Sequence, residues 1–245
     1  MWLFEKPIAH RGLHNETMTE NSMASFRHAI EKGYNIETDV HILKSGEVVV
    51  FHDFTLKRVC GINVKITDLT LEDINSEKYL LPNGEHIPLF SELIELAEGK
   101  TGILLELKLN GLNYDLERAV LNLIKGKESF IAVQAFNPFT IIWFKKHAPE
   151  FMRGSLSANA ILFLTKLTFK AMAPDFLAYN VSELATANKC YNKKGELNIL
   201  CWTVRTKENL LNAIKNKANN IIFEKVDLEQ ENFVQSSLRE PNLKR

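Results

Sequence analysis

Short apolar runs alternate with amphipathic segments along the whole chain. Runs such as Pro7–Arg11 and Ile36–Leu43 have the length and composition of strands, and segments such as Asp115–Ile124 and Lys207–Lys215 carry apolar residues at helical spacing. The further strand candidates are Gly102–Lys108, Phe130–Ala135, Met152–Leu156, Phe176–Asn180, Ile199–Val204 and Asn220–Phe223, and the further helix candidates are Met23–Ile30, Ile87–Leu96 (entered at Pro88) and Pro138–His147. This alternation predicts a parallel sheet, and eight such units favour an α/β fold of the closed (β/α)8 TIM type. No linker-like tract interrupts the series, so residues 1–245 are expected to form one domain.

Val48–His52 is a ninth strand candidate that follows the preceding strand after only four residues. A parallel crossover needs about a dozen residues or more, so this run is predicted to fold back as a short β-hairpin after the second strand. A two-residue turn at Ser45-Gly46 would place His52 opposite Asp39, beside Glu37. A longer turn would shift that register.

Composition and charge narrow the classes of partner. The 245 residues include 30 Lys or Arg and 30 Asp or Glu, so the formal net charge is zero. That balance argues against broad electrostatic capture of nucleic acid or of an anionic membrane. The longest apolar-rich stretch, Ala160–Ala173, is broken by Lys166 and Lys170 and is too short to span a bilayer. We therefore expect no nucleic-acid partner and no stable membrane insertion, and the sequence does not indicate an oligomeric state.

Cysteine usage and the start of the chain point to a compartment. Cys60, Cys190 and Cys201 are an odd number without a CxxC spacing, which is typical of reduced thiols rather than of disulfides or a zinc site. The first residues lack the apolar core of a signal peptide. A cytoplasmic protein is expected.

Three carboxylates at alternating strand positions suggest a cation site. Glu37 and Asp39 lie two residues apart and therefore share one face of their strand, and Glu106 and Lys108 repeat this spacing between apolar neighbours. A single such pair would usually be a solvent-facing strand edge or a structural ion pair. Three inward carboxylates on neighbouring strands require positive charge among them, and an all-oxygen set favours a hard cation, Mg²⁺ or Ca²⁺.

His10, Arg11 and Gly12 stand at the C-terminal end of the first strand, where barrel active sites are built. A histidine can exchange a proton near neutral pH, and an arginine can hold a phosphate through its planar fork. On its own, the tripeptide would indicate a capping or packing role rather than a catalytic one. His14 is nearby, but we expect an exposed loop histidine there.

Taken together, these motifs match a known family in order and spacing. The chain resembles the glycerophosphodiester phosphodiesterases through Ile8-Ala9-His10-Arg11-Gly12, Glu20-Asn21-Ser22, Glu37-Thr38-Asp39-Val40, Val49-Val50-Phe51-His52-Asp53 and Glu106-Leu107-Lys108, with later echoes in Gln134-Ala135-Phe136 and Trp202-Thr203-Val204. The resemblance covers nearly the full length. No single tripeptide is specific, whereas the ordered set is.

The resemblance implies an activity and a set of roles. It implies hydrolysis of small glycerophosphodiesters to sn-glycerol 3-phosphate and an alcohol, with one divalent cation, Ca²⁺ or Mg²⁺, as cofactor. In that family the residues matching Glu37, Asp39 and Glu106 bind the cation, those matching His10 and His52 are general acid and base, and those matching Arg11 and Lys108 hold the phosphate. We assign His10 as the base and His52 as the acid of the first step. The nucleophile is either water or a glycerol hydroxyl.

Further positions carry weaker expectations. Asn21, Phe136 and Trp202 are candidate substrate contacts, although Asn21 could instead serve the start of the first helix and the two aromatic residues could be core. The chain departs from the family pattern where Thr19 replaces a proline and Ala135 a serine. It also ends its last strand with Ile222-Phe223-Glu224 instead of a Thr-Asp pair, which puts the polar closure of the mouth on that side in doubt.

Two other functions stay open. One is a lipid phosphodiesterase, a lysophospholipase D or a relative of sphingomyelinase D, for which Ile161–Met172 would be an interfacial helix. We expect this segment to be a barrel helix facing the core. The other is a non-catalytic barrel that binds phosphoesters, which the intact set of ligands and histidines argues against.

Overall fold

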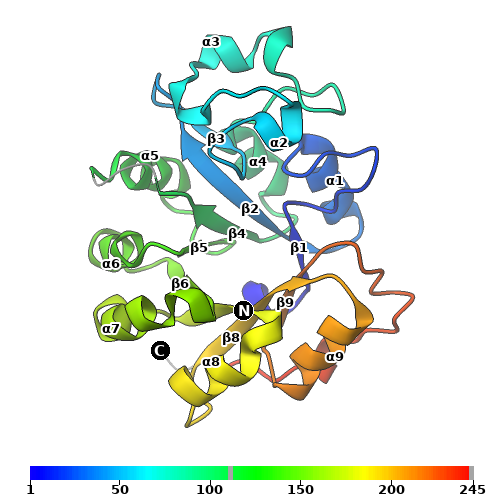
Figure 1. Cartoon of the computed structure of the whole chain (residues 1–245), viewed down its shortest axis with the longest axis vertical. Coiled ribbons are helices and arrows are strands. Elements are labelled where there is room, and N and C mark those ends of the chain that lie inside the picture. The colour runs from blue at the N-terminus through cyan, green and yellow to red at the C-terminus, as the bar shows by residue number, and fades with distance from the viewer. Residues whose placement is uncertain (110–112, 243–245) are drawn as a thin grey trace.

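A computed structural model describes residues 1–109 and 113–242, and its strands close into a parallel barrel (Figure 1). The first strand pairs with both the second and the last, which closes the sheet. The eight parallel strands are β1 (Ile8–His10), β2 (Asn35–Ile42), β4 (Ile103–Leu107), β5 (Ile131–Ala135), β6 (Met152–Ser157), β7 (Phe176–Asn180), β8 (Asn198–Val204) and β9 (Asn220–Phe223). The expected (β/α)8 architecture is confirmed.

Helices on the outside of the barrel connect the strands (Figure 1). They are α1 (Met23–Glu31), α4 (Phe90–Ala97), α5 (Asp115–Ile124), α6 (Pro138–His147), α7 (Leu162–Met172), α8 (Leu184–Tyr191) and α9 (Lys207–Lys215). A large apolar core fills the layer between these helices and the sheet, and a smaller one fills the barrel interior. Because each helix follows its strand, the polar residues that end the strands all meet at one mouth.

The predicted hairpin is present, but its register differs from the expectation. β3 (Val48–Val50) is antiparallel to β2 and pairs Val40 with Val50. Asp39 therefore lies opposite Phe51, whose N–H donates to its carbonyl at 3.0 Å, and not opposite His52. The cause is a three-residue turn instead of a two-residue one, with Gly46 at a φ of +104°. A residue with a Cβ rarely adopts that conformation, and the longer turn shifts the pairing by one position.

An excursion after β3 lies at one end of the molecule and contains α2 (Lys57–Cys60) and α3 (Leu71–Ile74), which the apolar pattern did not predict (Figure 1). It has its own small core, centred on residues such as Phe51, Leu56 and Ile66. This unit holds the segment after His52 against the barrel.

Two helices differ from their predicted form. α4 begins at Phe90 and not at Pro88, because Pro88 accepts a hydrogen bond from the Val50 N–H and Leu89 stays extended beside β3. α7 was expected to face the core with its apolar residues. Only Thr165 and Met172 of this helix are buried, whereas Phe163 and Leu167 are strongly exposed.

The bottom of the barrel is closed by a short helical turn, Trp2–Phe4, at the start of the chain. Leu3 and Phe4 are buried in the interior core, and Trp2 packs against it. Gly102, just before β4, leaves room for the indole, since a Cβ there would lie 1.9 Å from Trp2 Cε3. The glycine is required by a close approach of the two chain segments.

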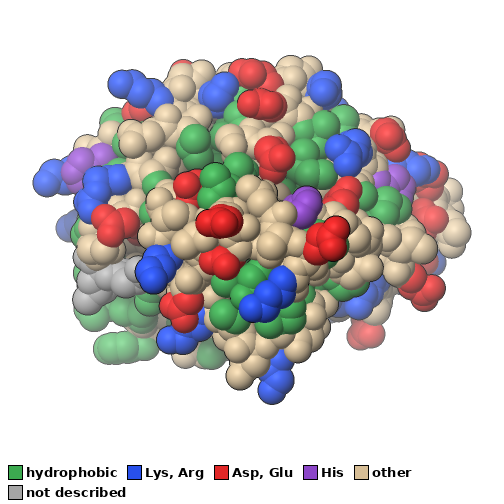
Figure 2. Space-filling model, turned by 90° about the horizontal axis from the view of Figure 1, so that it is seen from above, with side chains coloured by type: hydrophobic (Ala, Val, Ile, Leu, Met, Phe, Trp, Pro, Cys, Tyr) green, Lys and Arg blue, Asp and Glu red, His purple; other side chains and the backbone are tan. Residues whose placement is uncertain are grey.

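The surface seen in Figure 2 carries acidic and basic side chains interspersed, in keeping with the zero net charge. Among the described residues no helix has the length and apolar character needed to span a membrane.

Candidate active site

Three carboxylates converge at the mouth of the barrel. β2 and β4 pair in register so that Asp39 lies beside Glu106, and Glu37 shares the inward face of β2 with Asp39. One oxygen from each of the three groups lies within 4.8 Å of the others, and all three residues are buried. This is the inward cluster that the alternating positions predicted.

Burial and mutual repulsion perturb the three acids. Burial, reinforced by the Asp39 and Glu106 carboxylates, raises the pKa of Glu37 well above its usual range. Burial likewise raises the pKa of Glu106 to about 7. Burial also acts to raise the pKa of Asp39, but the charges of Lys108, His52 and Arg11 outweigh it and hold that pKa below its usual range. The cluster thus needs added positive charge to ionise fully.

Lys108 and Arg11 supply part of that charge. Lys108 Nζ lies 2.5 Å from Glu106 Oε1 and 2.8 Å from Asp39 Oδ1, and Arg11 Nε lies 3.5 Å from Asp39 Oδ2. Five oxygen-bearing and nitrogen-bearing side chains thereby occupy one small volume. The donor set on the acidic side is all oxygen, which fits a hard divalent cation such as Ca²⁺ or Mg²⁺.

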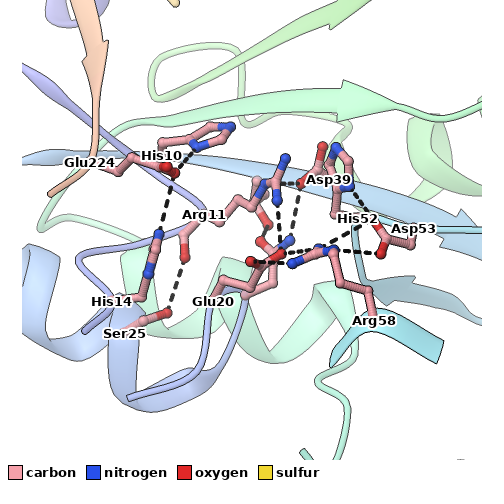
Figure 3. A network of polar contacts seen from close by, with 12 residues as sticks. His10, Arg11, His14, Glu20, Ser25, Asp39, His52, Asp53, Arg58 and Glu224 are labelled. Atoms are coloured by element: carbon pink, nitrogen blue, oxygen red, sulfur yellow. Dashed lines mark hydrogen bonds and ion pairs between the residues drawn. The ribbon is translucent and has the colours of Figure 1, made fainter. Parts of the chain in front are cut away.

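His10 is oriented by a carboxylate from the opposite end of the chain. Its Nδ1 lies 2.5 Å from Glu224 Oε2, so the ring donates its Nδ1–H to the carboxylate (Figure 3). The other nitrogen, Nε2, points towards the cluster and lies 3.9 Å from Glu37 Oε2. Burial lowers the pKa of His10, and the hydrogen bond to Glu224 opposes that effect. The ring is therefore held in one orientation with Nε2 facing the site.

Glu224 is a functional residue that sequence reasoning missed, since the departure at this position was expected to weaken the mouth. Its second oxygen accepts from Arg205 Nε at 2.6 Å. Burial alone would raise the pKa of Glu224, but hydrogen bonds from His10, His14 and Arg205 hold it well below the usual range. Glu224 thus stays ionised. The sequence did hold one signal for this role, namely an acidic residue directly after the last strand, because that position lies at the mouth of a barrel.

His14 is not the exposed loop residue that was expected. Its side chain is only 12% exposed, and Nε2 lies 3.4 Å from Glu224 Oε2. The loop after β1 turns back towards the mouth, where Leu13 N–H donates to the Ser25 carbonyl of α1. Gly12 makes this turn at a φ of +76°, and a Cβ there would meet Ser25 Oγ at 2.4 Å. Packing on α1 therefore requires this glycine.

A second imidazole has the same arrangement. His52 Nδ1 lies 2.5 Å from Asp53 Oδ1, and Arg58 Nε donates to the other Asp53 oxygen at 2.7 Å. Arg58 also donates to Glu20, which accepts from Arg11 NH1 at 2.8 Å (Figure 3). Burial lowers the pKa of His52, while the nearby Asp39 charge raises it. A chain of ion pairs thus links His52 to Arg11, the residue that follows His10.

Asn21 supports the cluster from behind. Its amide donates to Asp39 Oδ2 at 3.0 Å and accepts from the Thr38 hydroxyl at 2.8 Å. The side chain is buried and is not among the residues that line the mouth pocket. This geometry favours a role in positioning Asp39 over direct contact with substrate.

A pocket opens over the cluster between the two histidines. Phe136 and Trp202 form one wall, with ring centroids 5.6 Å apart and planes at 89°. Gln134, which pairs in register with Glu106, is buried beside them, and neither its Oε1 nor Trp202 Nε1 has a hydrogen-bond partner in the described part of the chain. The lining residues are His10, Arg11, Glu37, His52, Glu106, Lys108, Gln134, Phe136, Leu156, Trp202, Thr203, Arg205 and Ile222.

All but two of the site residues expected from the sequence line this pocket, the exceptions being Asp39 and Asn21. Gln134 and Arg205 join them without having been assigned a role. Gln134 could have been found as a polar residue inside an otherwise apolar strand. Arg205 carried no signal, because its partner Glu224 is adjacent only in the folded chain.

Comparison with known proteins agrees with this geometry. The model of the glycerophosphoryl diester phosphodiesterase family matches residues 10–228. A glycerophosphodiester phosphodiesterase of Caldanaerobacter subterraneus subsp. tengcongensis is 31% identical over 231 residues, which cover 88% of this chain and 92% of that protein. Lysophospholipase D GDPD1 of Homo sapiens is 38% identical over 132 residues, which cover 49% of this chain and 41% of that protein.

A solved structure gives the same result for the fold. The crystal structure of a glycerophosphodiester phosphodiesterase from Thermotoga maritima superposes with a TM-score of 0.75 at 26% identity and covers 92% of this chain and 97% of that one. The family model and the bacterial relative both extend over most of the sequence. This chain therefore belongs to the glycerophosphoryl diester phosphodiesterase family.

Proposed function

We propose that the protein is a divalent-cation-dependent hydrolase that cleaves glycerophosphodiesters to sn-glycerol 3-phosphate and an alcohol. The observation that carries the proposal is one pocket in which His10 and His52 both face the Glu37, Asp39 and Glu106 cluster. A binding site for phosphoesters would need positive charge, but it would not need two oriented imidazoles. The named activity of the bacterial relative is of the same kind.

The two histidines are assigned to proton transfer. With Nδ1 of each ring held by a carboxylate, Nε2 is the atom left to exchange a proton in the pocket. We assign His10 as the base that takes a proton from the nucleophile and His52 as the acid that protonates the leaving alkoxide. An alkoxide is a poor leaving group, so its protonation lowers the barrier.

The charged side chains are assigned to the phosphate. A Ca²⁺ or Mg²⁺ ion held by Glu37, Asp39 and Glu106 would stabilise negative charge on the phosphoryl oxygens. Arg11 and Lys108 already lie against these carboxylates, and both line the pocket. A phosphate entering there would be offered a guanidinium and an ammonium from the same wall.

Gln134 and Trp202 are assigned to the glycerol. Glycerol hydroxyls both donate and accept hydrogen bonds, and these residues offer a buried acceptor and an indole donor that have no partner in the described chain. Phe136 lies edge-to-face with the Trp202 indole, and its ring would pack against the carbon atoms of the glycerol. The pocket thus combines an anion-binding wall with a small, partly apolar wall.

The direct test is release of sn-glycerol 3-phosphate from a panel of glycerophosphodiesters. We expect chelation to abolish turnover and Ca²⁺ or Mg²⁺ to restore it. His10→Ala and His52→Ala should each lose about 10²–10⁴-fold in rate while staying folded, because each removes a general acid or base. Normal turnover in His52→Ala would refute the acid–base assignment, and turnover that survives complete chelation would refute the cation dependence.

Lysophospholipase D activity is the second candidate. It is favoured by the exposed apolar side chains of α7 and by the human relative that carries this name. Rates on glycerophosphocholine and on lysophosphatidylcholine separate the two. A clear preference for the lysophospholipid would make it the main activity.

A further inference from the structure

The outer side of α7 is an apolar surface on a helix that should present polar residues. Phe163 is 80% exposed and Leu167 is 70% exposed, and they stand one turn apart on the same side of the helix. The inner side is mixed, with Met172 buried, Phe169 packed against the core and a buried threonine beside them. Thr165 is buried and its hydroxyl lies 2.9 Å from Ser157 Oγ in β6. Burial of apolar residues alone would not leave Phe163 and Leu167 on the solvent side of such a helix.

More exposed apolar residues lie next to this helix, at the mouth. Leu164 belongs to the first turn of α7, Phe139 to the first turn of the neighbouring α6, and Phe136 to the pocket wall just after β5. Helices α6 and α7 pack on each other and lie on one side of the barrel (Figure 1). The exposed apolar residues belong to these two helices or to the segment just before α6. We call Phe136, Phe139, Phe163, Leu164 and Leu167 the apolar rim.

Apolar side chains also protrude at the lower left of Figure 2, the side on which α5, α6 and α7 lie in Figure 1. A large exposed apolar surface on a protein is usually covered by a partner or by lipid. We therefore expect a partner molecule or a lipid surface to cover the apolar rim.

The charged residues of α6 and α7 indicate which kind of partner fits the apolar rim. Neither α6 nor α7 contains an acidic residue, and α7 carries Lys166 and Lys170, in a chain whose overall charge is zero. Lys166 and Lys170 are exposed on α7, beside the apolar side chains. We propose that the outer face of α7, with the apolar rim, docks on an anionic lipid surface. Phe163 and Leu167 enter the boundary of the acyl chains, and the two lysines reach the phosphates.

The same residues argue against a second copy of the chain as occupant. Neither α6 nor α7 contains an acidic residue. A dimer formed through this face would bring Lys166 and Lys170 near their own copies with no carboxylate on either helix to pair them. Like charges brought together at an interface oppose association. Lipid phosphates, in contrast, complement these lysines.

Docking in this way has a consequence for the site. Phe136 belongs both to the apolar rim and to the wall of the active-site pocket, so the lipid surface would lie beside the mouth. The orientation rests on the proposed function, but the docking itself does not. A binding measurement without substrate therefore tests the surface independently of catalysis.

The experiment is co-flotation of the full chain with phosphatidylcholine vesicles that contain phosphatidylglycerol. We expect binding that weakens with added salt and with vesicles of phosphatidylcholine alone. Phe163→Ser and Leu167→Ser should each reduce the partition coefficient about tenfold, because each removes a large apolar side chain from the interface. Lys166→Glu should reduce it about fivefold or more, and only for the anionic vesicles.

Leu211→Ser is the matched control, since Leu211 is 58% exposed on α9 and does not belong to α7 or to the apolar rim. It should bind like the parent, and all four variants should keep parental turnover of a water-soluble glycerophosphodiester. Absence of vesicle binding would overturn the proposal. Equal binding of Phe163→Ser and parent would also overturn it, as would a dimer in light scattering that Phe163→Ser dissolves.

Discussion

Glu224 shows how one residue can decide the geometry of a site from outside the motifs that mark it. The histidine that it holds lies more than two hundred residues earlier in the chain, and the bond joins the first and last strands of the barrel. A carboxylate at Nδ1 fixes the ring and stabilises the imidazolium that forms when the ring accepts a proton. The role assigned to His10 therefore depends on Glu224.

We expect Glu224→Gln to lower kcat about tenfold or more with little change in KM. The amide oxygen can still accept the Nδ1–H, but it lacks the charge that stabilises the protonated ring. The ¹⁵N shifts of His10 should move at the same time. His14→Ala is the control and should stay near the parental rate, because its contact of 3.4 Å is the weakest at this carboxylate. An unchanged kcat in Glu224→Gln would show that the bond is only structural.

Glu106→Gln tests the cation site. The substitution keeps the shape of the side chain and removes one of three negative charges, so calorimetry should show weaker Ca²⁺ or Mg²⁺ binding with a much smaller loss of folding stability. The Lys108 ammonium loses a partner in the same variant. Equal cation affinity in variant and parent would remove Glu106 from the ligand set.

The three carboxylates could be predicted from the sequence because of their place on strands. Glu37, Asp39 and Glu106 lie on strands, where a fixed alternation tells which side chains point inwards. Glu224 and Arg205 meet only after the barrel closes, and neither periodicity nor spacing encodes that contact. Asn21 was ambiguous because its partner Asp39 lies on another element.

Among the elements, the strands followed their apolar patterns, whereas helix α7 and the hairpin turn did not. The hairpin register depended on the conformation of Gly46, which local sequence leaves open between a two-residue and a three-residue turn. His52 nevertheless lines the pocket, because the excursion that follows β3 packs on its own core and holds that segment in place. Strand pairing up to Phe51 and the packing of the excursion together position this histidine.

The contact between Gly102 and Trp2 gives a prediction at this scale. A methyl group on Gly102 would overlap the indole, so Gly102→Ala should reduce the free energy of unfolding by about 1–3 kcal/mol, as overpacking does. Urea denaturation measures the change. In a Trp2→Ala background the same substitution should cost much less, since the space is then empty. An equal cost in both backgrounds would mean that the indole is not the cause.

For the whole molecule, the thiols report how tightly the barrel is closed. Cys201 is fully buried on β8, and burial raises the pKa of its thiol, while burial raises the pKa of Cys60 to about 11. Maleimide reacts with thiolates, so Cys60 should be labelled faster as the pH rises towards that value. Mass spectrometry of the native protein should find Cys201 unlabelled until urea opens the barrel. Early labelling of Cys201 would indicate local opening of β8.

Because β1 pairs with β9, the barrel can close only after the last strand has been synthesised. Three carboxylates and two histidines are present once the first half of the chain has been synthesised, yet β1 has only one neighbour until residues 220–223 arrive. The entropy of closing so long a loop must be overcome before the contact forms, so contacts between such distant segments slow folding. A nascent chain or a fragment that ends before Asn220 would carry nearly every catalytic group but leave His10 without its carboxylate. The protein would thus become active only when the last strand is in place.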